Sequence, residues 1–315
     1  MLDKIDKKLL AELDKDSRQS FSQIGKKLKT SKEVVRYHFE NLIKKGIIKN
    51  CYALVDNYKI VYLIHIVWIK FHNITSEIEQ EIITKLVNTK NVGVVIKLYG
   101  KWDLVIGIWA KNTIDFYNYY NEMSGEFNKY IKDRLITVEV NCSYLGQKFL
   151  YDQTIPTVRI GNSLKEEKID EQDIEIIKAL AINSRIPAID LATKLKLSPN
   201  AVIARIKKLE KGSIIAAYKV NIDYEKIGFS HHRIFLKANI SKKEAIKSYI
   251  ETLPQVISVM NYVGYADIEF RICVKDSVEI YELLSNLRKR FQDSIEEYDS
   301  VMFLKSFDIL NFLPI

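Results

Sequence analysis

The hydrophobic positions of this chain change period from block to block, and the blocks recur in the same order in each half. Ile5, Leu9 and Leu13 fall at the three- to four-residue spacing of an amphipathic helix. Residues 62–71 form an alternating, β-rich run, which is typical of a strand. The pattern therefore predicts an α+β chain made of two similar halves.

The clearest block is the stretch 198–215. Ser198 is a favourable N-cap, and Pro199 suits the first helical position because its missing N–H costs nothing there. The apolar positions form one narrow stripe, made of Val202, Ile206 and Leu209. The opposite face is small, polar and basic, so the helix has the shape needed to enter a DNA major groove.

A second copy of this stretch lies 167 positions earlier. The matching positions are Ser31/Ser198, Val35/Val202, Leu42/Leu209, Lys44/Lys211 and Ile47-Ile48/Ile214-Ile215. Matches at one constant offset indicate an internal duplication.

Each copy begins with three predicted helices and a strand. In the first copy Asp3 caps the first helix, and Ser20 with Gln23 forms a capping box for the second. The corresponding helices of the second copy begin at Asp170 and Pro187. Extended strands follow the third helices, over residues 47–55 and 214–222. Three helices and a strand in this order predict a winged helix-turn-helix.

The remainder of each copy has the order β-α-β-β-α-β. In the first copy we predict a strand at 62–71, a helix at 77–88, two strands joined by the turn 99–103, a long helix at 113–133 and a final strand. In the second copy the corresponding segments are 229–238, 242–253, 263–267 and 277–293. This order predicts a ferredoxin-like domain.

We therefore predict four domains, two in each copy, and a linker between the copies. They are a winged helix-turn-helix at 1–60, a ferredoxin-like domain at 61–149, a linker at 150–168, a second winged helix-turn-helix at 169–227 and a second ferredoxin-like domain at 228–315. The linker is predicted from its Pro156, Gly161, Asn162 and Ser163 and from a charge run.

Composition narrows the functional class. With 47% hydrophobic and 28% charged residues, the chain is a folded, globular protein. The net charge is +8, and residues 1–60 hold most of the excess, with 14 Lys/Arg against 8 Asp/Glu. Basic charge beside the duplicated helix favours a polyanion partner. In the second copy, which is only weakly basic, solvated surface lysine is the alternative.

The sequence favours a cytoplasmic setting without membrane contact. Three cysteines far apart in the chain form neither a disulfide framework nor a metal-ligand spacing. The first residues are charged where a signal peptide needs an apolar core, and the longest apolar run, 62–71, is about half the length of a membrane helix.

The arrangement resembles the Lrp/AsnC (feast/famine) family of transcription regulators over nearly the whole chain. In the first copy the residues that carry the resemblance are Leu2 to Asp6, Ser17-Arg18, Ser31, Val35 and Leu42 to Ile48. In the second copy they are Ile169 to Asp173, Ser184-Arg185, Ser198, Val202, Arg205-Ile206, Leu209 and Ile214-Ile215. The Gly-x-x-Asp turns, Gly100–Asp103 and Gly264–Asp267, look like the hairpin turn of the family's effector-binding (RAM) domain.

The resemblance implies a regulator that binds double-stranded DNA and takes a small-molecule effector such as an amino acid. Family members are typically single-copy chains that dimerise through their ferredoxin-like sheets, and many form octamers. A tandem chain supplies both halves, so we expect an intramolecular pseudo-dimer that can form further homo-oligomers. His38 stands where the second copy has the family's Arg205, so the two readers need not prefer the same half-site. Trp102 in the first copy corresponds to Ala266 in the second, so the two effector sites need not be equivalent.

Residues at the start and on the outer face of each third helix are the predicted DNA contacts. They are Ser31, Lys32, Glu33, Arg36, Tyr37 and His38 in the first copy, and Ser198, Asn200, Ala204, Arg205, Lys207 and Lys208 in the second. Asn200 suits adenine, whereas Arg36 and Arg205 suit guanine or phosphate. The alternative is solvated helix surface. Arg18 and Arg185 either brace their module or contact phosphate.

The predicted effector site consists of Gly100, Asp103, Gly264 and Asp267. The alternative is that each glycine serves the turn and each aspartate bonds its own turn. We predict no catalytic residue, metal ligand or cofactor, because the sequence shows no metal spacing, no Ser/His/Asp grouping and no phosphate-binding glycine loop.

The leading hypothesis is a sequence-specific, non-enzymatic transcription regulator with two non-identical DNA readers. One alternative is an enzyme resembling the siroheme decarboxylases, which share the two-module layout; His65, His231 and His232 would then line a tetrapyrrole pocket. The segment 256–262 lacks their characteristic histidine, which favours the regulator. The other alternative is an architectural DNA-binding protein.

Overall fold

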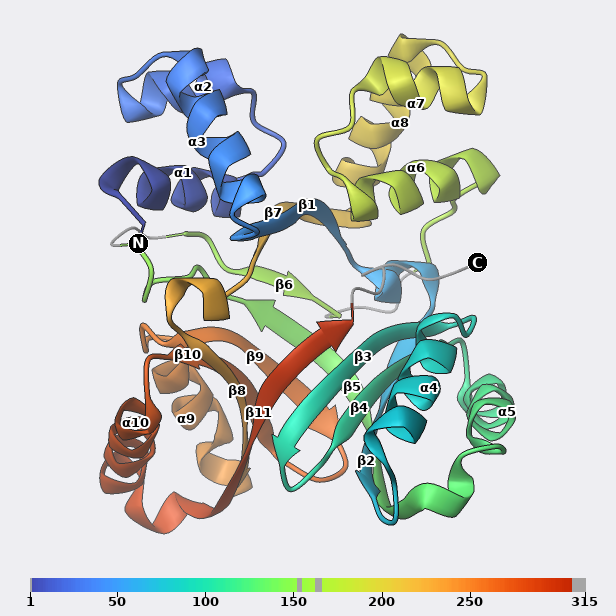
Figure 1. The fold of residues 1–315 in the computed structure, drawn as a ribbon, viewed down its shortest axis with the longest axis vertical. Coiled ribbons are helices and arrows are strands. Elements are labelled where there is room, and N and C mark those ends of the chain that lie inside the picture. Colours follow the sequence, from blue (N-terminus) through green and yellow to red (C-terminus); the bar gives the residue numbers. More distant parts are fainter. Residues whose placement is uncertain (1, 152–154, 162–165, 308–315) are drawn as a thin grey trace.

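The computed structural model describes residues 2–151, 155–161 and 166–307, and places two helical lobes on one end of a β-barrel (Figure 1). The first lobe contains α1 (Lys4–Lys15), α2 (Phe21–Leu28) and α3 (Lys32–Lys44). The second contains α6 (Glu171–Ile182), α7 (Ala188–Leu195) and α8 (Pro199–Lys211). None of the described helices is long and apolar enough to cross a membrane.

The predicted helix starts are confirmed. Asp3, Ser20 and Asp170 each form a capping box, in which the cap side chain accepts a backbone N–H and the residue three positions on bonds back to the cap. Ser31 and Ser198 each accept one backbone N–H at the start of the third helix. The apolar stripes of α3 and α8 face inward, with Val35, Leu42, Val202 and Leu209 fully buried.

A two-stranded ribbon joins the lobes. It consists of β1 (Ile48–Val55) and β7 (Ile215–Ile222), which pair antiparallel. Leu9 and Leu10 of α1 share a core with Val220 of β7, whereas Leu180 of α6 shares one with Leu54 of β1. Each lobe therefore packs on the strand of the other copy, so neither copy is complete without its counterpart.

The two ferredoxin-like domains form one closed sheet. The strands of the first are β2 (Leu63–Phe71), β3 (Val92–Gly100), β4 (Leu104–Ala110) and β5 (Ile131–Tyr144). Those of the second are β8 (Ser230–Ala238), β9 (Val256–Val263), β10 (Ile268–Val274) and β11 (Ile295–Phe307). In the described residues the order is β2-β4-β3-β11-β8-β10-β9-β5, and β5 pairs again with β2. Since β11 pairs with β3 and β5 with β9, the copies pair within one chain.

Helices cover the outside of this barrel. They are α4 (Ser76–Val87) and α5 (Thr113–Ser124) on the first copy, and α9 (Lys243–Ile250) and α10 (Ser277–Arg290) on the second (Figure 1). Short 3-10 helices are η1 (Asn57–Ile60), η2 (Asn128–Tyr130), η3 (Glu225–Ile227), η4 (Ile240–Lys242) and η5 (Gln292–Ser294). Along β2 the side chains alternate: Val67 and Ile69 pack with the helices, whereas Ile66 and Trp68 face the barrel interior.

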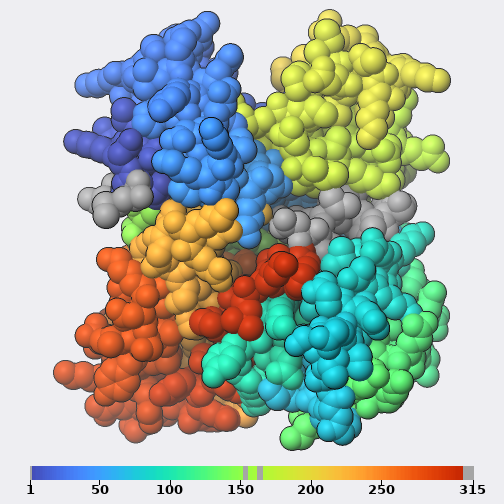
Figure 2. Space-filling view, in the orientation of Figure 1, coloured from blue at the N-terminus to red at the C-terminus, as the bar shows by residue number. Residues whose placement is uncertain are grey.

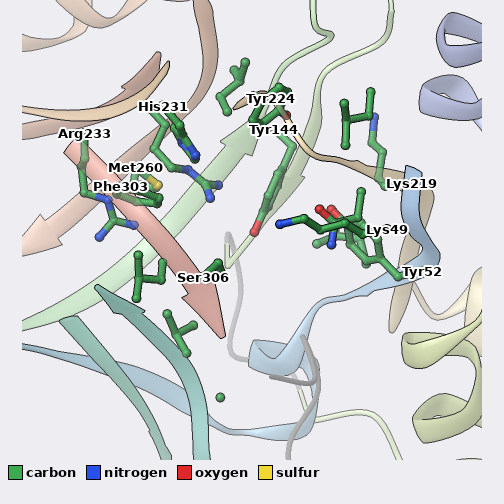
Figure 3. Close-up of a pocket in the computed structure, with 18 of the residues that line it drawn as sticks. Lys49, Tyr52, Tyr144, Lys219, Tyr224, His231, Arg233, Met260, Phe303 and Ser306 are labelled. Carbon is green, nitrogen blue, oxygen red and sulfur yellow. The ribbon is translucent and has the colours of Figure 1, made fainter. Parts of the chain in front are cut away.

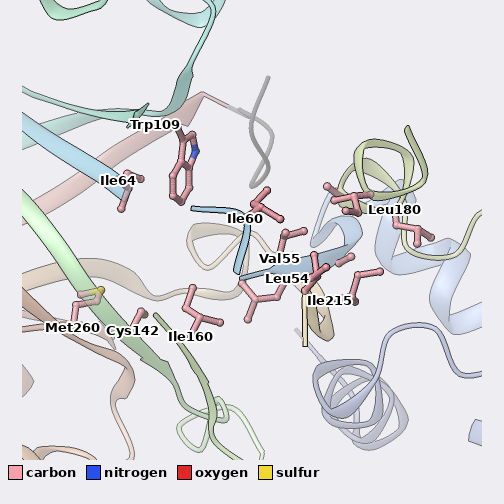
Figure 4. Close-up of a cluster of buried hydrophobic side chains, with 14 of the residues drawn as sticks. Leu54, Val55, Ile60, Ile64, Trp109, Cys142, Ile160, Leu180, Ile215 and Met260 are labelled. Atoms are coloured by element: carbon pink, nitrogen blue, oxygen red, sulfur yellow. The ribbon is translucent and has the colours of Figure 1, made fainter. Parts of the chain in front are cut away.

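The interior apolar cluster continues out of the barrel. Figure 4 shows Ile64 and Trp109 of the barrel, Leu54 and Ile215 of the ribbon, and Leu180 of the second lobe, all of which belong to one buried cluster. Barrel, ribbon and second lobe are thus held together by one continuous core.

One predicted helix is too long, and the predicted linker contains regular structure. The helix predicted at 113–133 ends at Ser124, where Gly125 is the C-cap, and the chain is already extended from Ile131 onward in β5. The predicted linker 150–168 contains β6 (Val158–Ile160), which pairs with β5, and its Ile155 is buried. Asn162 and Ser163, on which the linker prediction also relied, lie outside the described residues.

Candidate nucleic-acid interface and central cavity

The third helices present exposed outer faces at the same end of the molecule. Side chains exposed there are Ser31, Lys32, Glu33, Arg36 and Tyr37 on α3, and Ser198, Asn200, Ala204, Lys207 and Lys208 on α8. Tyr37 is 67% exposed, the most open aromatic of the first lobe's third helix. Figure 2 shows the two lobes as separate protrusions with a gap between them.

His38 and Arg205 occupy equivalent positions but lie against their own lobes. Arg205 Nη1 is 2.7 Å from a carboxylate oxygen of both Asp170 and Asp173 at the start of α6. The buried Asp173 also pairs with Lys208, at 3.1 Å. In the first copy His38 Nδ1 is 2.8 Å from Asp6 Oδ1. The inner side of each third helix is thereby tied to the first helix of its lobe.

Asp3, Asp6 and His38 also form a group of metal-ligand type. One ligand atom of each lies within 4.8 Å of the others. This group was not predicted from the sequence, because 32 positions separate His38 from Asp6. In the second copy the guanidinium of Arg205 occupies the same place beside Asp170 and Asp173.

Arg18 and Arg185 brace the two lobes against each other. Arg18 Nη1 donates to the carbonyl of Ser184, and Arg185 Nη1 donates to the carbonyls of Ser17 and, at 2.9 Å, Gln19. The hydroxyls of Ser17 and Ser184 lie 2.7 Å apart at the centre of this reciprocal pair. These contacts favour the bracing interpretation over phosphate contact.

The Gly-x-x-Asp turns use their side chains within the fold. Gly100 and Gly264 have φ of 130° and 137°, a conformation that favours glycine. Asp103 accepts the backbone N–H of Phe71, and Asp267 accepts that of Ala238, both within 2.9 Å. Each aspartate therefore fixes the end of the neighbouring strand rather than bonding only its own turn.

A cavity of about 490 Å³ lies between the barrel and the ribbon. Side chains from both copies line it, including Lys49 and Tyr52 of β1, Tyr144 of β5, Lys219 of β7 and His231 of β8 (Figure 3). Lys219 is buried and ion-paired with Asp14, with 3.2 Å between Nζ and Oδ1. The cavity joins elements of all four domains.

Buried charged groups line this cavity or lie next to its lining. Arg233 and Glu269, both buried, form an ion pair with Nε and Oε1 2.6 Å apart. Burial raises the pKa of Glu269 to about 7, although the charge of Arg233 acts to lower it. Burial also raises the pKa of Glu139, whose Oε2 accepts a 2.8 Å hydrogen bond from Tyr262. Burial lowers the pKa of His231, and the neighbouring Arg271 adds to that effect.

Sequence reasoning missed most of these residues. They are spread over strands β1, β5, β7, β8, β9 and β10, and the order of pairing that brings these strands together was not predicted. One signal was present: at several strand positions where the first copy is apolar, the second copy has a charged residue, as at Ile66 and Arg233.

Comparisons with known proteins agree with the helical lobes. Residues 2–49 match the winged helix-turn-helix DNA-binding model, and residues 169–210 match the AsnC-type helix-turn-helix model. The lobes are therefore winged helix-turn-helix DNA-binding domains.

Sequence relatives are transcription regulators. The chain is 37% identical to LrpC of Bacillus subtilis over 91 residues, which span 28% of this chain and 62% of LrpC. It is 32% identical to the transcriptional regulator AzlB of Bacillus subtilis over 113 residues, or 34% of this chain and 71% of AzlB. The chain belongs to the Lrp/AsnC family of helix-turn-helix transcription regulators.

A solved structure of an enzyme resembles the fold of nearly the whole chain. The siroheme decarboxylase NirDL matches over 97% of this chain and 93% of its own, with a TM-score of 0.64 and 13% sequence identity. At that identity the match shows a common fold, with both copies in the same arrangement.

Proposed function

We propose that this protein is a sequence-specific transcription regulator that binds one asymmetric DNA site with two unlike readers. The observation that carries the proposal is the pair of exposed, chemically different outer faces on α3 and α8, held at one end of the molecule by the ribbon. Lys32, Arg36 and Tyr37 make the first face basic and aromatic. Asn200, Ala204 and Lys207 give the second face smaller side chains and one side-chain amide. Different side chains in equivalent places would read different bases.

The direct experiment measures binding to DNA selected from random sequence. The double variant Lys32→Ala/Arg36→Ala should weaken binding about 10- to 100-fold, since base and phosphate contacts are being removed. Asn200→Ala should relax base preference in the other half-site only. Lys289→Ala, on the exposed surface of α10 at the opposite end, is the matched control and should leave affinity unchanged. Equal binding by all four proteins would overturn the proposal.

Salt dependence separates this proposal from an architectural role. Affinity should fall steeply with salt, because lysine and arginine displace counterions. The preference for selected over random DNA should reach about a thousandfold or more for a specific regulator. A small preference with equally steep salt dependence would indicate an architectural protein.

An amino-acid effector and further self-association belong to the same proposal. Tyr117 on α5 and Tyr281 on α10 occupy equivalent positions and are 63% and 72% exposed, so each copy offers an exposed aromatic side chain on the outside of the barrel for assembly. The solution mass should be a multiple of 36.7 kDa and fall to that value when both tyrosines become glutamate. Titration with the common amino acids, followed by DNA affinity, tests the effector.

The whole-chain fold likeness to NirDL supports a second candidate, a tetrapyrrole decarboxylase. Its discriminating experiment is titration with iron uroporphyrin III. Saturable one-to-one binding with a shifted Soret band, together with loss of carbon dioxide from siroheme, would favour the enzyme. No spectral change would favour the regulator.

A further inference from the structure

The inner face of the barrel differs between the two copies in a way that the fold does not require. Equivalent positions that are hydrocarbon or glycine in the first copy and polar in the second are Ile64/His231, Ile66/Arg233, Val94/Ser258, Val105/Glu269 and Gly107/Arg271. At these positions the first copy shows that apolar side chains are compatible with the fold. Burying charges instead costs several kcal/mol per ion before pairing. The polar set therefore calls for an explanation other than packing.

Two arginines and two glutamates lie close together here, and the two arginines differ in their partners. Arg233 pairs with Glu269, and Glu139 accepts a hydrogen bond from Tyr262. Arg271 donates from Nε to Ser258 Oγ at 2.5 Å, and its guanidinium lies 5.6 Å from the centre of the Tyr144 ring. No carboxylate in the described part of the chain forms an ion pair with Arg271. Its two terminal nitrogens, with their N–H donors, are left for a ligand.

Apolar side chains of the first copy also line the cavity. They include Ile66, Ile96 and the indole of Trp109. Trp109 is 7% exposed, and its Nε1 has no hydrogen-bond partner among the described residues. The indole lies over Gly93, where a Cβ would come within 2.1 Å of Nε1, so glycine makes room for the ring. A buried indole N–H without an acceptor is unusual.

We propose that this cavity binds an organic monocarboxylate with a flat apolar body. The carboxylate accepts two parallel hydrogen bonds from the terminal N–H groups of Arg271, and the apolar body lies against Trp109 and Ile66. A volume of about 490 Å³ lies within the range of small-molecule sites. One unpaired guanidinium matches one carboxylate.

Ligand binding at this place would act on the ribbon. Tyr52 and Leu54 of β1, with Lys219 and Val220 of β7, form one side of the cavity, and the same strands carry the two lobes. The regulatory consequence, a change in how the lobes present α3 and α8, rests on the proposed DNA-binding function. The binding itself does not.

Isothermal titration with 2-naphthoate as the probe tests the site, and 2-naphthalenemethanol serves as the matched uncharged probe. The full chain should bind one 2-naphthoate, at least about tenfold more tightly than the alcohol, because a charged hydrogen bond is being formed. Arg271→Gln should reduce 2-naphthoate binding to the level of the alcohol. Arg290→Gln, an exposed arginine on α10, should have no effect.

A second variant keeps the inference testable if Arg271→Gln proves unstable. Ile66→Phe fills the apolar side of the cavity and should weaken both probes alike, with their ratio preserved. Equal affinity of the two probes for the wild-type protein, or unchanged binding by a folded Arg271→Gln variant, would overturn the inference. The titration contains no DNA, so its failure is distinguishable from failure of the proposed regulator function.

Discussion

Arg205 and His38 show how one position has diverged between the copies. Both hold the third helix to the first helix through an aspartate of the capping box, Asp173 in one copy and Asp6 in the other. The sequence predicted them as DNA contacts because they lie on helices with exposed outer faces. The sequence could not show that each side chain contacts an aspartate more than thirty residues away in the chain.

Arg205→Ala is therefore expected to lower the free energy of unfolding by about 1 kcal/mol, because among the described residues the buried Asp173 then keeps Lys208 as its one ion-pair partner. Urea denaturation measures this change. Lys207 is a neighbouring exposed residue that forms no ion pair with the described part of the chain, so Lys207→Ala is the control and should stay within about 0.5 kcal/mol of wild type. A loss of DNA affinity with unchanged stability would instead assign Arg205 to the DNA interface.

His65 gives a pH prediction. It is buried on the outer side of β2, stacked on Phe116 with ring centres 4.3 Å apart, and burial lowers its pKa below the ordinary 6.5. The unfolded chain therefore binds a proton at this residue more readily than the native state, so its contribution to stability is present above pH 6.5 and is lost as the pH falls.

Replacing His65 with phenylalanine should remove that loss. Between about pH 7.5 and 5.5 the variant should lose less unfolding free energy than wild type. The difference between the two proteins is the quantity to measure, because the raised pKa of Glu269 acts in the opposite direction in both. Identical pH slopes would contradict the account.

At the scale of elements, the sequence predicted most helices and strands because their signals are local. Ser31, Ser198 and the capping boxes fix helix starts within one turn of chain. The strand pairings β3–β11 and β5–β9 could not be predicted from the sequence, because they join residues of different copies and form only when the whole barrel forms. The same holds for the charged cavity, whose residues meet only once the barrel has closed.

The reciprocal arginine pair should be essential to the arrangement of the lobes. Arg185 donates to two carbonyls of the first lobe and lies 4.4 Å from the centre of the Phe21 ring. Arg185→Ala should lower the unfolding free energy by about 2 kcal/mol, through lost hydrogen bonds and a lost cation–π contact. Arg36→Ala, on the exposed side of α3, should change it by less than about 0.5 kcal/mol. Equal effects of the two variants would show that the pair does not brace the lobes.

At the scale of the molecule, duplication has allowed the two copies to specialise. Where the first copy has Ile66, Val105 and Gly107 in the barrel interior, the second copy has Arg233, Glu269 and Arg271. One reader became basic and aromatic, and the other kept a smaller outer face. In a dimer of identical chains every such change would occur twice. A single chain that closes its own barrel is free of that constraint.

The most direct test of two unlike readers is footprinting on the selected DNA site with half-site swaps. The account predicts two protected regions about 10 base pairs apart, or a multiple of that, with different sequences. Lys32→Ala/Arg36→Ala should weaken protection of one region, and Asn200→Ala should relax the sequence requirement of the other. Replacing one half-site by the other should lower affinity at least tenfold. A symmetric site, bound equally well when either half is duplicated, would contradict the account.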